Sequence, residues 1–468
     1  MQKMDSPPSV ILRFVRAGTA RLPRFKRRPD LRRGPSSPQE PRRATPQRLL
    51  ILTPFPPSLE GHHGGARVIA QFIVHLGDQM SIAVLCLRHP TDVLPDNSVL
   101  DNIELFEQVP RPAITSRPSR AVRAVRWRLA LLRGWPFWAS ELNVPEYRDR
   151  LKDLMRSFRP DVIQIEYPVM AQYAAAITDF SHVPRVLVEH DPEVGSLYGN
   201  HRATVRDRLE ALAWKRFARR ALRQVDAAVV FTEQDHDALA PMAGETPIVR
   251  IPIGTDFVER AFEPVECDGS LLFVGSFVHA PNVEAVRRLI ESIFPRVRET
   301  HPDCKLVVVG KSIPADILQA KAPGVVLTGW VEDVIPYVRR AAVVVAPMQQ
   351  GGGMRVKVLE ALAAQKAVVA SPLAVAGLDV IDGKQLRIAH DDSEFAARVV
   401  ELLDDAEERQ ALANRARSWA LDNLHWTGSI RAYERLYAQL VAHHPPLQAD
   451  HRGPRQGSRS QSRTIHSP

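Results

Sequence analysis

The sequence predicts an α/β protein built from two doubly wound domains, and two observations support this prediction. Short apolar runs, rich in leucine or β-branched residues, alternate with helical stretches along the chain in two successive series. The segment 251–268, which contains proline, glycine and several acids, separates the two series and is predicted to be a linker. Continuous apolar strands separated by helices are typical of parallel sheets covered on both faces. We therefore expect domains at 48–250 and 269–425, joined by a hinge.

Each strand is predicted from a compact run bounded by polar or turn residues. In the first domain these runs are Arg48–Leu52, Ser81–Leu85, Val162–Glu166, Arg185–Glu189 and Ala227–Phe231. In the second domain they are Leu271–Val274, Lys305–Val309, Val325–Thr328, Val343–Ala346 and Ala367–Ala370. Ligands of such sheets bind beyond the carboxyl ends of the strands, so the residues that follow each strand are the candidates for chemistry.

The composition is that of a globular enzyme, and its basic charge is confined to the two ends. Of 468 residues, 45% are hydrophobic and 25% are charged, which excludes a disordered or fibrous chain. Residues 1–47 hold twelve Lys or Arg and three Asp or Glu, and residues 444–468 hold four Arg and one Asp, so the middle of a chain with net charge +9 is slightly acidic. Both ends, rich in Pro, Ser and Arg, are predicted to be disordered. A charge restricted to such tails does not indicate nucleic-acid binding.

Neither the cysteines nor the apolar runs indicate secretion or membrane spanning. The three cysteines, Cys86, Cys267 and Cys304, lie far apart, which excludes a disulfide scaffold and a zinc finger. The longest apolar runs fall far short of the roughly 20 residues that a membrane helix needs. No segment has the pattern of a secretory signal, so we expect a cytoplasmic protein.

Two loops of the first domain carry candidate ligand-binding residues. Gly64 and Gly65 follow the first strand and precede a helix predicted from Arg67. A glycine pair there lets backbone N–H groups approach an anion, although this feature taken alone favours a flexible turn. His190, between Glu189 and Asp191 at the end of the fourth strand, could donate to a sugar hydroxyl or a phosphate, or could be a structural histidine. The dinucleotide fingerprint G-x-G-x-x-G is absent from these turns, which argues against NAD.

The segment 343–363 gives the strongest signal. A buried strand runs into Gly351, Gly352 and Gly353, and a helix is predicted from about Met354. Arg355 and Lys357 place two positive charges in the first turn, which is the unfavourable end of the helix dipole. A bound diphosphate would explain both the bare N–H groups and the charges. The alternative is a flexible loop followed by a surface ion pair between Lys357 and Glu360.

With these residues in place, the sequence resembles the retaining glycosyltransferases of the GT-B fold, specifically the nucleotide-sugar-dependent family 4. The resemblance covers about residues 48–443 and rests on the glycine pair, on Glu189-His190-Asp191, on 351–363 and on four further stretches, at 229–235, 251–256, 272–282 and 329–333. It implies two Rossmann-like domains that face a central cleft, an acceptor side at 48–250, a donor-binding side at 269–425 and a terminal helix at 426–443 that crosses back to the first domain.

The resemblance also implies roles for single residues. Glu360 would be the second acid of the family's paired-Glu motif and would hold the donor ribose. Gly352 stands where that motif has its first acid, so backbone N–H groups of Gly352–Met354 would contact the donor sugar. Neither Arg nor Lys follows Gly275, so Arg355 and Lys357 would neutralise the diphosphate. The catalytic set implied is His190, Arg355 and Lys357. The donor-binding set implied is Gly64, Gly65, Gly275, Ser276, Gly351, Gly352, Gly353, Met354 and Glu360.

The implied activity is transfer of a sugar from a nucleotide-diphosphate sugar to a hydroxyl acceptor, a lipid-linked or cell-surface glycan, with retention and with neither metal nor cofactor. The Asp-x-Asp at Asp235–Asp237 falls at a predicted helix start, where N-capping explains it. Two alternatives remain open. One is a nucleotide-sugar 2-epimerase of the same fold, and the other is a catalytically silent protein that binds a sugar nucleotide.

The acceptor half contains a basic amphipathic segment. Between Glu107 and Glu141 the chain has no acid but seven arginines: Arg111, Arg117, Arg120, Arg123, Arg126, Arg128 and Arg133. A helix predicted from about Ser119 places apolar residues on one face, with aromatic residues beside or after it: Val122, Val125, Leu129, Leu132, Trp127, Trp135, Phe137 and Trp138. Together with residues 1–47, this pattern favours contact with the anionic inner face of a membrane, the alternative being a packed helix with a solvated Arg face.

Overall fold

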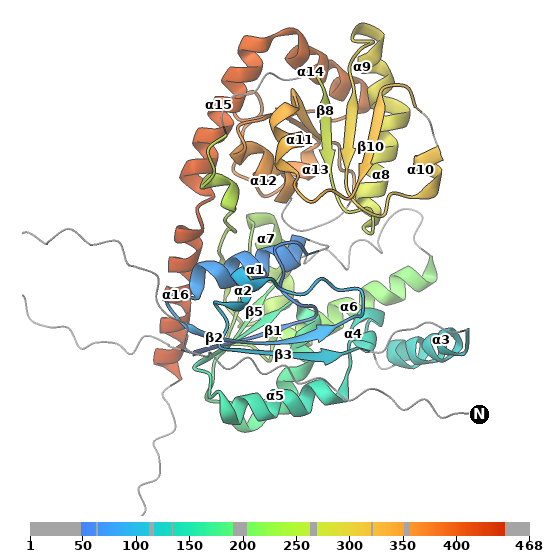
Figure 1. Cartoon of the computed structure of the whole chain (residues 1–468). Coiled ribbons are helices and arrows are strands. Elements are labelled where there is room, and N and C mark those ends of the chain that lie inside the picture. Colours follow the sequence, from blue (N-terminus) through green and yellow to red (C-terminus); the bar gives the residue numbers. More distant parts are fainter. Residues whose placement is uncertain are drawn as a thin grey trace, which may run out of the picture.

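The computed structural model describes residues 48–61, 64–111, 117–132, 134–190, 204–262, 269–319, 322–350 and 356–444. They form two wholly parallel sheets, one of seven strands in the order β3-β2-β1-β4-β5-β6-β7 and one of six in the order β10-β9-β8-β11-β12-β13. Figure 1 shows each sheet with helices packed around it, one domain lying above the other. The predicted α/β architecture with two doubly wound sheets is therefore confirmed.

The first domain contains strands whose bounds agree with the predicted runs to within three residues, plus two strands that were not predicted. Its strands are β1 (Arg48–Thr53), β2 (Ser81–Arg88), β3 (Leu105–Pro110), β4 (Val162–Glu166), β5 (Arg185–Val188), β6 (Ala227–Val230) and β7 (Ile248–Arg250). Its helices are α1 (Gly64–Leu76), α2 (Asn97–Leu100), α3 (Arg117–Leu132), α4 (Phe137–Glu141), α5 (Pro145–Ser157), η1 (Pro168–Phe180), α6 (Val205–Leu222) and α7 (Glu233–Ala243). The unpredicted strands β3 and β7 are the two edges of the sheet, where half-exposed polar residues interrupt the apolar pattern.

The second domain follows a short 3₁₀ turn, η3 (Asp256–Val258). Its strands are β8 (Leu271–Val274), β9 (Leu306–Val309), β10 (Val325–Gly329), β11 (Val343–Ala346), β12 (Ala367–Ala370) and β13 (Arg387–Ile388). Its helices are α8 (Ala280–Arg288), η4 (Leu289–Ile293), α9 (Phe294–Thr300), α10 (Ala315–Gln319), α11 (Ile335–Arg340), α12 (Val356–Ala363), α13 (Pro372–Val375), α14 (Asp392–Asp404) and α15 (Ala406–Asn423). The two-residue edge strand β13 is too short to give a sequence signal.

Burial on both faces explains why the strands are continuously apolar. Leu49 and Ile51 of β1 face one hydrophobic cluster, which includes α1, while Leu50 and Leu52 face the other, which includes α5. All four are fully buried. Because successive side chains of a strand point to opposite faces, a sheet covered on both sides needs an apolar residue at every position.

The last helix, α16 (Trp426–His443), leaves the second domain and lies against the first, as Figure 1 shows in red. The ring of Tyr433 packs edge-on against Phe72 of α1, with ring centroids 4.8 Å apart. In the linker, a Cβ at Gly254 would lie 2.6 Å from the Cγ of Trp426, so only glycine allows this approach. The oxygen Oγ of Ser429 also donates to the carbonyl of Pro252. Linker and helix are therefore held together where the chain crosses back.

Candidate active site

The first turn of α1 lies against the second domain. The helix begins at Gly64 itself, three residues earlier than predicted. A Cβ at Gly64 would lie 3.7 Å from Cγ2 of Val356, the first residue of α12, and a Cβ at Gly65 would lie 1.9 Å from the hydroxyl oxygen of Tyr167. Close approach to Tyr167 therefore requires glycine at position 65. The helix starts of α1 and α12 face each other across the domains.

Glu360 of α12 pairs with the first domain and not with its own helix. Its Oε1 lies 3.4 Å from Nη1 of Arg67 on α1, and its side chain is only 12% exposed. Burial raises the pKa of Glu360, and the charges of Arg67 and Lys357 oppose that rise. The ion pair of Glu360 is thus the one to Arg67, while the charge of Lys357, the partner expected from the sequence, also acts on the carboxylate. The carboxylate lies instead at the junction of the two domains.

Lys357 is tied to the loop that follows β8. Its Nζ donates to Oδ1 of Asn282 at 2.6 Å and lies 4.5 Å from the ring centroid of Phe273. The amide Nδ2 of Asn282 in turn donates to the carbonyl oxygen of Ser276 at 2.8 Å. These contacts bring Lys357 of the predicted catalytic set to Gly275 and Ser276 of the predicted donor-binding set, beyond the carboxyl end of β8.

A second lysine, absent from the prediction, lies beside this loop. Lys311 follows β9, and its carbonyl accepts from the N–H of Phe277 at 3.0 Å. Its Nζ is buried and has no hydrogen-bond partner among the described residues, and the same holds for Oγ of Ser276. Burial lowers the pKa of Lys311 to about 8. Buried donors without partners are costly unless a ligand completes them, which is the chemistry of an anion site.

The electrostatics of His279 show that the two lysines act on one place. This residue precedes α8, and burial, followed by the charges of Lys357 and Lys311, lowers its pKa. The charge of Lys311 therefore acts on the loop that follows Gly275, for which the sequence predicted no Arg or Lys. The signal that could have found it is a lysine directly after Gly310, the glycine that follows β9.

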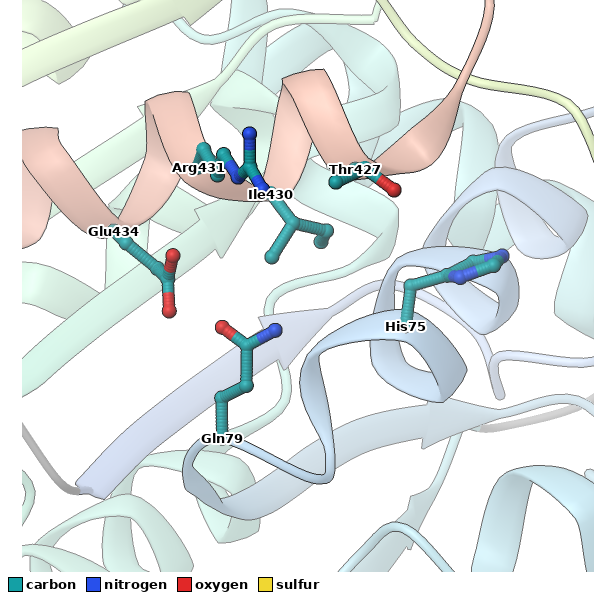
Figure 2. A pocket seen from close by; sticks show the side chains of 6 residues that line it. All are labelled: His75, Gln79, Thr427, Ile430, Arg431 and Glu434. Atoms are coloured by element: carbon teal, nitrogen blue, oxygen red, sulfur yellow. The ribbon is translucent and has the colours of Figure 1, made fainter. Parts of the chain in front are cut away.

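A pocket of about 540 Å³ opens beside the same loop. It is lined by Phe277, Val278, Ala280, Val283, Glu284 and Arg287. Another pocket, of about 320 Å³, lies between the carboxyl end of α1 and α16 and is shown in Figure 2 with its lining residues His75, Gln79, Thr427, Ile430, Arg431 and Glu434. Because it lies at the opposite end of α1 from Gly64, this second pocket does not belong to the lysine-lined site.

Five residues of the predicted site lie outside the described residues: Gly351, Gly352, Gly353, Met354 and Arg355. The described helix α12 begins directly after them, at Val356. Their contacts with the donor therefore stay predictions.

His190 lies at the carboxyl end of β5 in a buried aromatic setting. Its Nε2 is 2.6 Å from Oε2 of Glu166, and its ring stacks on that of Tyr167 with centroids 4.2 Å apart. Tyr167 has φ = 68°, a left-handed conformation that non-glycine residues rarely adopt and that clusters at functional sites. Through Tyr167, His190 is linked to the glycine start of α1. Sequence reasoning identified His190 but not Glu166 or Tyr167.

The Asp-x-Asp sequence has a local structural role, although not the one predicted. The oxygen Oγ1 of Thr232 accepts from the backbone N–H of Asp235 at 3.0 Å, so Thr232 is the N-cap of α7 and Asp235 is the third residue of the helix. Within the described residues, one group of possible metal ligands, Glu233, His236 and Asp237, has ligand atoms within 4.8 Å of one another. Two of the three are exposed, and such acidic clusters are common at helix starts without a metal.

Comparisons with known proteins agree with this architecture. A family model described as Glycosyltransferase Family 4 matches residues 63–258, and one described as Glycosyl transferases group 1 matches residues 268–405. Together they cover more than two thirds of the chain. The first match falls on the domain that contains His190, and the second on the domain that contains both lysines and Glu360.

Relatives and solved structures are distant. The chain is 27% identical over 308 residues to a glycogen synthase of Mycobacterium tuberculosis, covering 62% of this chain and 71% of that protein. It is 27% identical over 180 residues, 36% of this chain, to an uncharacterized glycosyltransferase of Methanocaldococcus jannaschii, and spans only 45% of its length. The fold is similar to that of a sucrose-phosphate synthase from Thermosynechococcus elongatus (TM-score 0.64, 15% identity, 85% of this chain and all of the other). It is also similar to that of Anabaena HepE in complex with UDP (TM-score 0.60, 12% identity, 84% of this chain and all of the other).

Proposed function

Because the chain belongs to the group 1 glycosyltransferases of the GT-B fold, we propose that it transfers a sugar from a nucleotide-diphosphate sugar to a hydroxyl acceptor, with retention and without a metal. The observation that carries this proposal is the pair formed by Lys311, just after β9, and Lys357, in the first turn of α12. Nζ of Lys311 is buried without a hydrogen-bond partner among the described residues, and Nζ of Lys357 is held by Asn282. Lys357 and Lys311 lie beside Gly275 and Ser276, and Glu360 lies one turn from Lys357. This arrangement suits a diphosphate attached to a ribose.

The donor would bind with its diphosphate at the lysines and its ribose at Glu360. The amino end of α12 adds the positive end of a helix dipole at the same place. The carboxylate of Glu360 can accept from ribose hydroxyls, in place of or beside its bond to Arg67. A nucleoside diphosphate as the donor core is supported by the similar fold of HepE, which was solved with UDP.

The chemistry then needs little more than stabilisation of the leaving group. The bond between the sugar anomeric carbon and the phosphate oxygen breaks, and negative charge develops on the diphosphate. Fixed cations such as Lys311 and Lys357 stabilise that charge most strongly in a site from which water is excluded. The acceptor oxygen bonds to the anomeric carbon on the same face, and its proton passes to the departing phosphate oxygen. His190 belongs to the other domain, and the resemblance implies that it would contact the sugar or the diphosphate.

Binding of nucleoside diphosphates tests this proposal directly. We expect calorimetry to show binding of at least one nucleoside diphosphate, with unchanged affinity in excess EDTA and much weaker binding of the matching nucleoside. A strict requirement for a divalent metal, or equal affinity for diphosphate and nucleoside, would contradict the proposed site.

The pH dependence of that binding should follow Lys311. Its pKa of about 8 in the free protein means that the lysine is largely charged at pH 7 and largely neutral at pH 9. The affinity for the diphosphate should therefore fall by about tenfold as pH rises, since a charge-assisted hydrogen bond contributes roughly 1.5–3 kcal/mol. The variant Lys311→Met should bind more weakly at pH 7 and show a much flatter pH profile. A wild-type affinity that is constant from pH 7 to 9 would exclude Lys311 from the site.

We also propose that the acceptor is reached at a membrane surface, through α3 and α6. Among the described residues, large apolar side chains are exposed in two rows on these helices: Val122, Val125, Leu129 and Leu132 on α3, and Val205, Leu209 and Leu212 on α6. The α6 row was not predicted. Arg208, Lys215 and Arg216 lie exposed beside that row. Apolar rows flanked by cations suit the surface of an anionic bilayer.

The aromatic residues of this region face inward, which corrects one expectation. The rings of Trp138 and Trp214 stack with centroids 5.9 Å apart, and Trp135 packs against Phe217. Trp127 donates to Glu210 at 3.3 Å and thereby fastens α3 to α6. The side chains of Arg117, Arg120, Arg123, Arg126 and Arg133 lie outside the described residues. In the part of the chain that the structure describes, no helix has the length and hydrophobicity needed to cross a membrane.

Vesicle co-sedimentation can separate this surface from general charge effects. We expect Leu129→Glu and Leu209→Glu each to reduce binding to vesicles of anionic phospholipid by several-fold, because a charge would replace an inserting apolar side chain. Ile381→Glu is the matched control, since Ile381 is 59% exposed but lies in the second domain. It makes the same change in net charge and should leave vesicle binding unchanged. Equal effects of all three variants, or no binding by the wild type at low salt, would refute the membrane proposal.

A further inference from the structure

A row of buried polar side chains runs from α16 to His190. The hydroxyl of Tyr437 donates to Oε1 of Gln164, and Nε2 of Gln164 donates to Oε1 of Glu166. The other carboxylate oxygen of Glu166 lies 2.6 Å from Nε2 of His190. Exposed fractions are 0% for Tyr437, 1% for Gln164, 2% for Glu166 and 8% for His190, so the whole row is shielded from water.

The position of this row in the sheet is unusual. Gln164 and Glu166 lie on the same face of β4, a central strand between β1 and β5. Ile163 and Ile165 lie on the other face and pack in the apolar core. Burying a carboxylate and an amide there is unfavourable unless every polar atom finds a partner. Apolar residues would pack this face with less cost. The buried polar pair therefore points to a task beyond packing.

That task is visible at the histidine. A carboxylate can only accept, so Glu166 holds a proton on Nε2 of His190 and leaves Nδ1 as the other polar atom of the ring. Stacking on Tyr167 at an interplanar angle of 11°, and an edge contact with Phe231 at 5.1 Å, fix the plane of the ring. Hydrogen-bond partner and ring contacts together restrict His190 to one tautomer and one orientation.

We propose that Glu166 is a positioning residue that holds His190 in this tautomer for sugar transfer, and that Tyr437, acting through Gln164, makes the arrangement depend on the docking of α16. The inference rests on the proposed function, because His190 must face the reacting sugar. Its structural basis is separate, since it concerns residues of the first domain and α16 and none of the donor-site lysines. The helix α16 follows directly from the second domain, so the position of that domain and the state of the histidine are linked.

The first test is the tautomer itself. Nitrogen-15 NMR of histidine-labelled protein, with the His190 signal assigned by its loss in His190→Gln, should show a proton on Nε2 in the wild type. Glu166→Gln should change that signal toward a mixture of tautomers or a proton on Nδ1. A His190 signal that is identical in wild type and Glu166→Gln would overturn the proposal. This readout needs no turnover, so it is informative even if the proposed activity is wrong.

The second test separates positioning from stability. Glu166→Gln should lower kcat at least about tenfold, as loss of an orienting partner does at other sites, while leaving the affinity for the nucleoside diphosphate unchanged. Tyr437→Phe should lower kcat in the same direction but less. The control is Tyr147→Phe. Tyr147 is fully buried in the first domain and its hydroxyl donates to the carbonyl of Leu85, away from Gln164 and Glu166, so this variant should leave kcat unchanged.

If Glu166→Gln does not fold, the comparison of Tyr437→Phe with Tyr147→Phe decides. Equal kcat values for those two variants would refute the proposed coupling to α16. A parallel loss of diphosphate affinity and kcat would show a merely structural role. Wild-type protein without turnover of any sugar nucleotide would refute the proposed function, whereas the NMR result would still report on the tautomer.

Discussion

Lys357→Ala is expected to weaken the binding of a nucleoside diphosphate by about ten- to hundredfold, and to change the binding of the bare nucleoside far less. The reason is that Lys357 would make charge-assisted bonds to the diphosphate, each contributing roughly 1.5–3 kcal/mol, from a position already fixed by its 2.6 Å bond to Asn282. Calorimetry with both ligands measures the two losses. Arg355→Ala should act in the same sense, because the sequence places it in the same turn of chain.

A matched control is available just beyond the same helix. Lys366 donates to the carbonyl oxygens of Arg339 and Ala341, at 2.6 and 3.2 Å. Lys366→Ala makes the same change in charge within the same domain, and should leave diphosphate affinity unchanged. Equal losses for diphosphate and nucleoside in Lys357→Ala would show that this charge supports the fold and not a phosphate.

Glu360→Ala is expected to weaken donor binding at least about tenfold while the protein stays folded. The carboxylate would accept from two ribose hydroxyls, so the effect should depend on those hydroxyls. Wild-type protein should prefer a ribonucleoside diphosphate over its 2′,3′-dideoxy analogue, and Glu360→Ala should bind the two alike. Calorimetry with this ligand pair therefore isolates the ribose contact.

The ion pair with Arg67 provides the control for Glu360. Arg67→Ala removes the 3.4 Å contact but keeps the carboxylate, so it should retain the preference for ribose. If Glu360 serves only to join the domains, both variants should lower the melting temperature alike and neither should change the preference.

The raised pKa of Glu360 predicts how donor affinity should change at acidic pH. Burial raises the pKa, so protonation begins at a higher pH than for an exposed glutamate. As pH falls through that pKa, the carboxylate loses the charge that strengthens its bonds to ribose hydroxyls. Donor affinity should therefore decline on acidification in the wild type and stay flatter in Glu360→Ala.

How much of the fold could be predicted depended on how deeply each strand is buried. The bounds of β8, β11 and β12 match the predicted runs, because central strands covered on both faces are apolar at every position. The edge strands β3, β7 and β13 were missed. Their residues are partly exposed, so polar side chains interrupt the pattern on which the prediction relied.

For the candidate site, what could be predicted depended on whether a residue carries a local sequence signal. Residues that carry their own local signal were found, such as the glycine pair at the start of α1 and Lys357 in the first turn of α12. Residues that matter through tertiary contacts were missed. Arg67 reaches Glu360 only because the two domains meet, which the sequence around Glu360 does not indicate. Glu166 lies 24 positions from His190, its hydrogen-bond partner. Tyr437 lies 273 positions from Gln164, and a local sequence pattern cannot predict a contact at that separation.

The most direct test of the central claim is transfer of labelled sugar. The protein would be incubated with a panel of nucleotide sugars carrying a labelled sugar, with a membrane lipid extract and with excess EDTA, and the label and the released nucleoside diphosphate would be followed together. We expect one nucleotide sugar to release diphosphate and an equal amount of label to enter the acceptor with its anomeric configuration retained. Conversion of the nucleotide sugar to its epimer, or tight binding of it without transfer to any acceptor, would contradict glycosyl transfer as the function of this site.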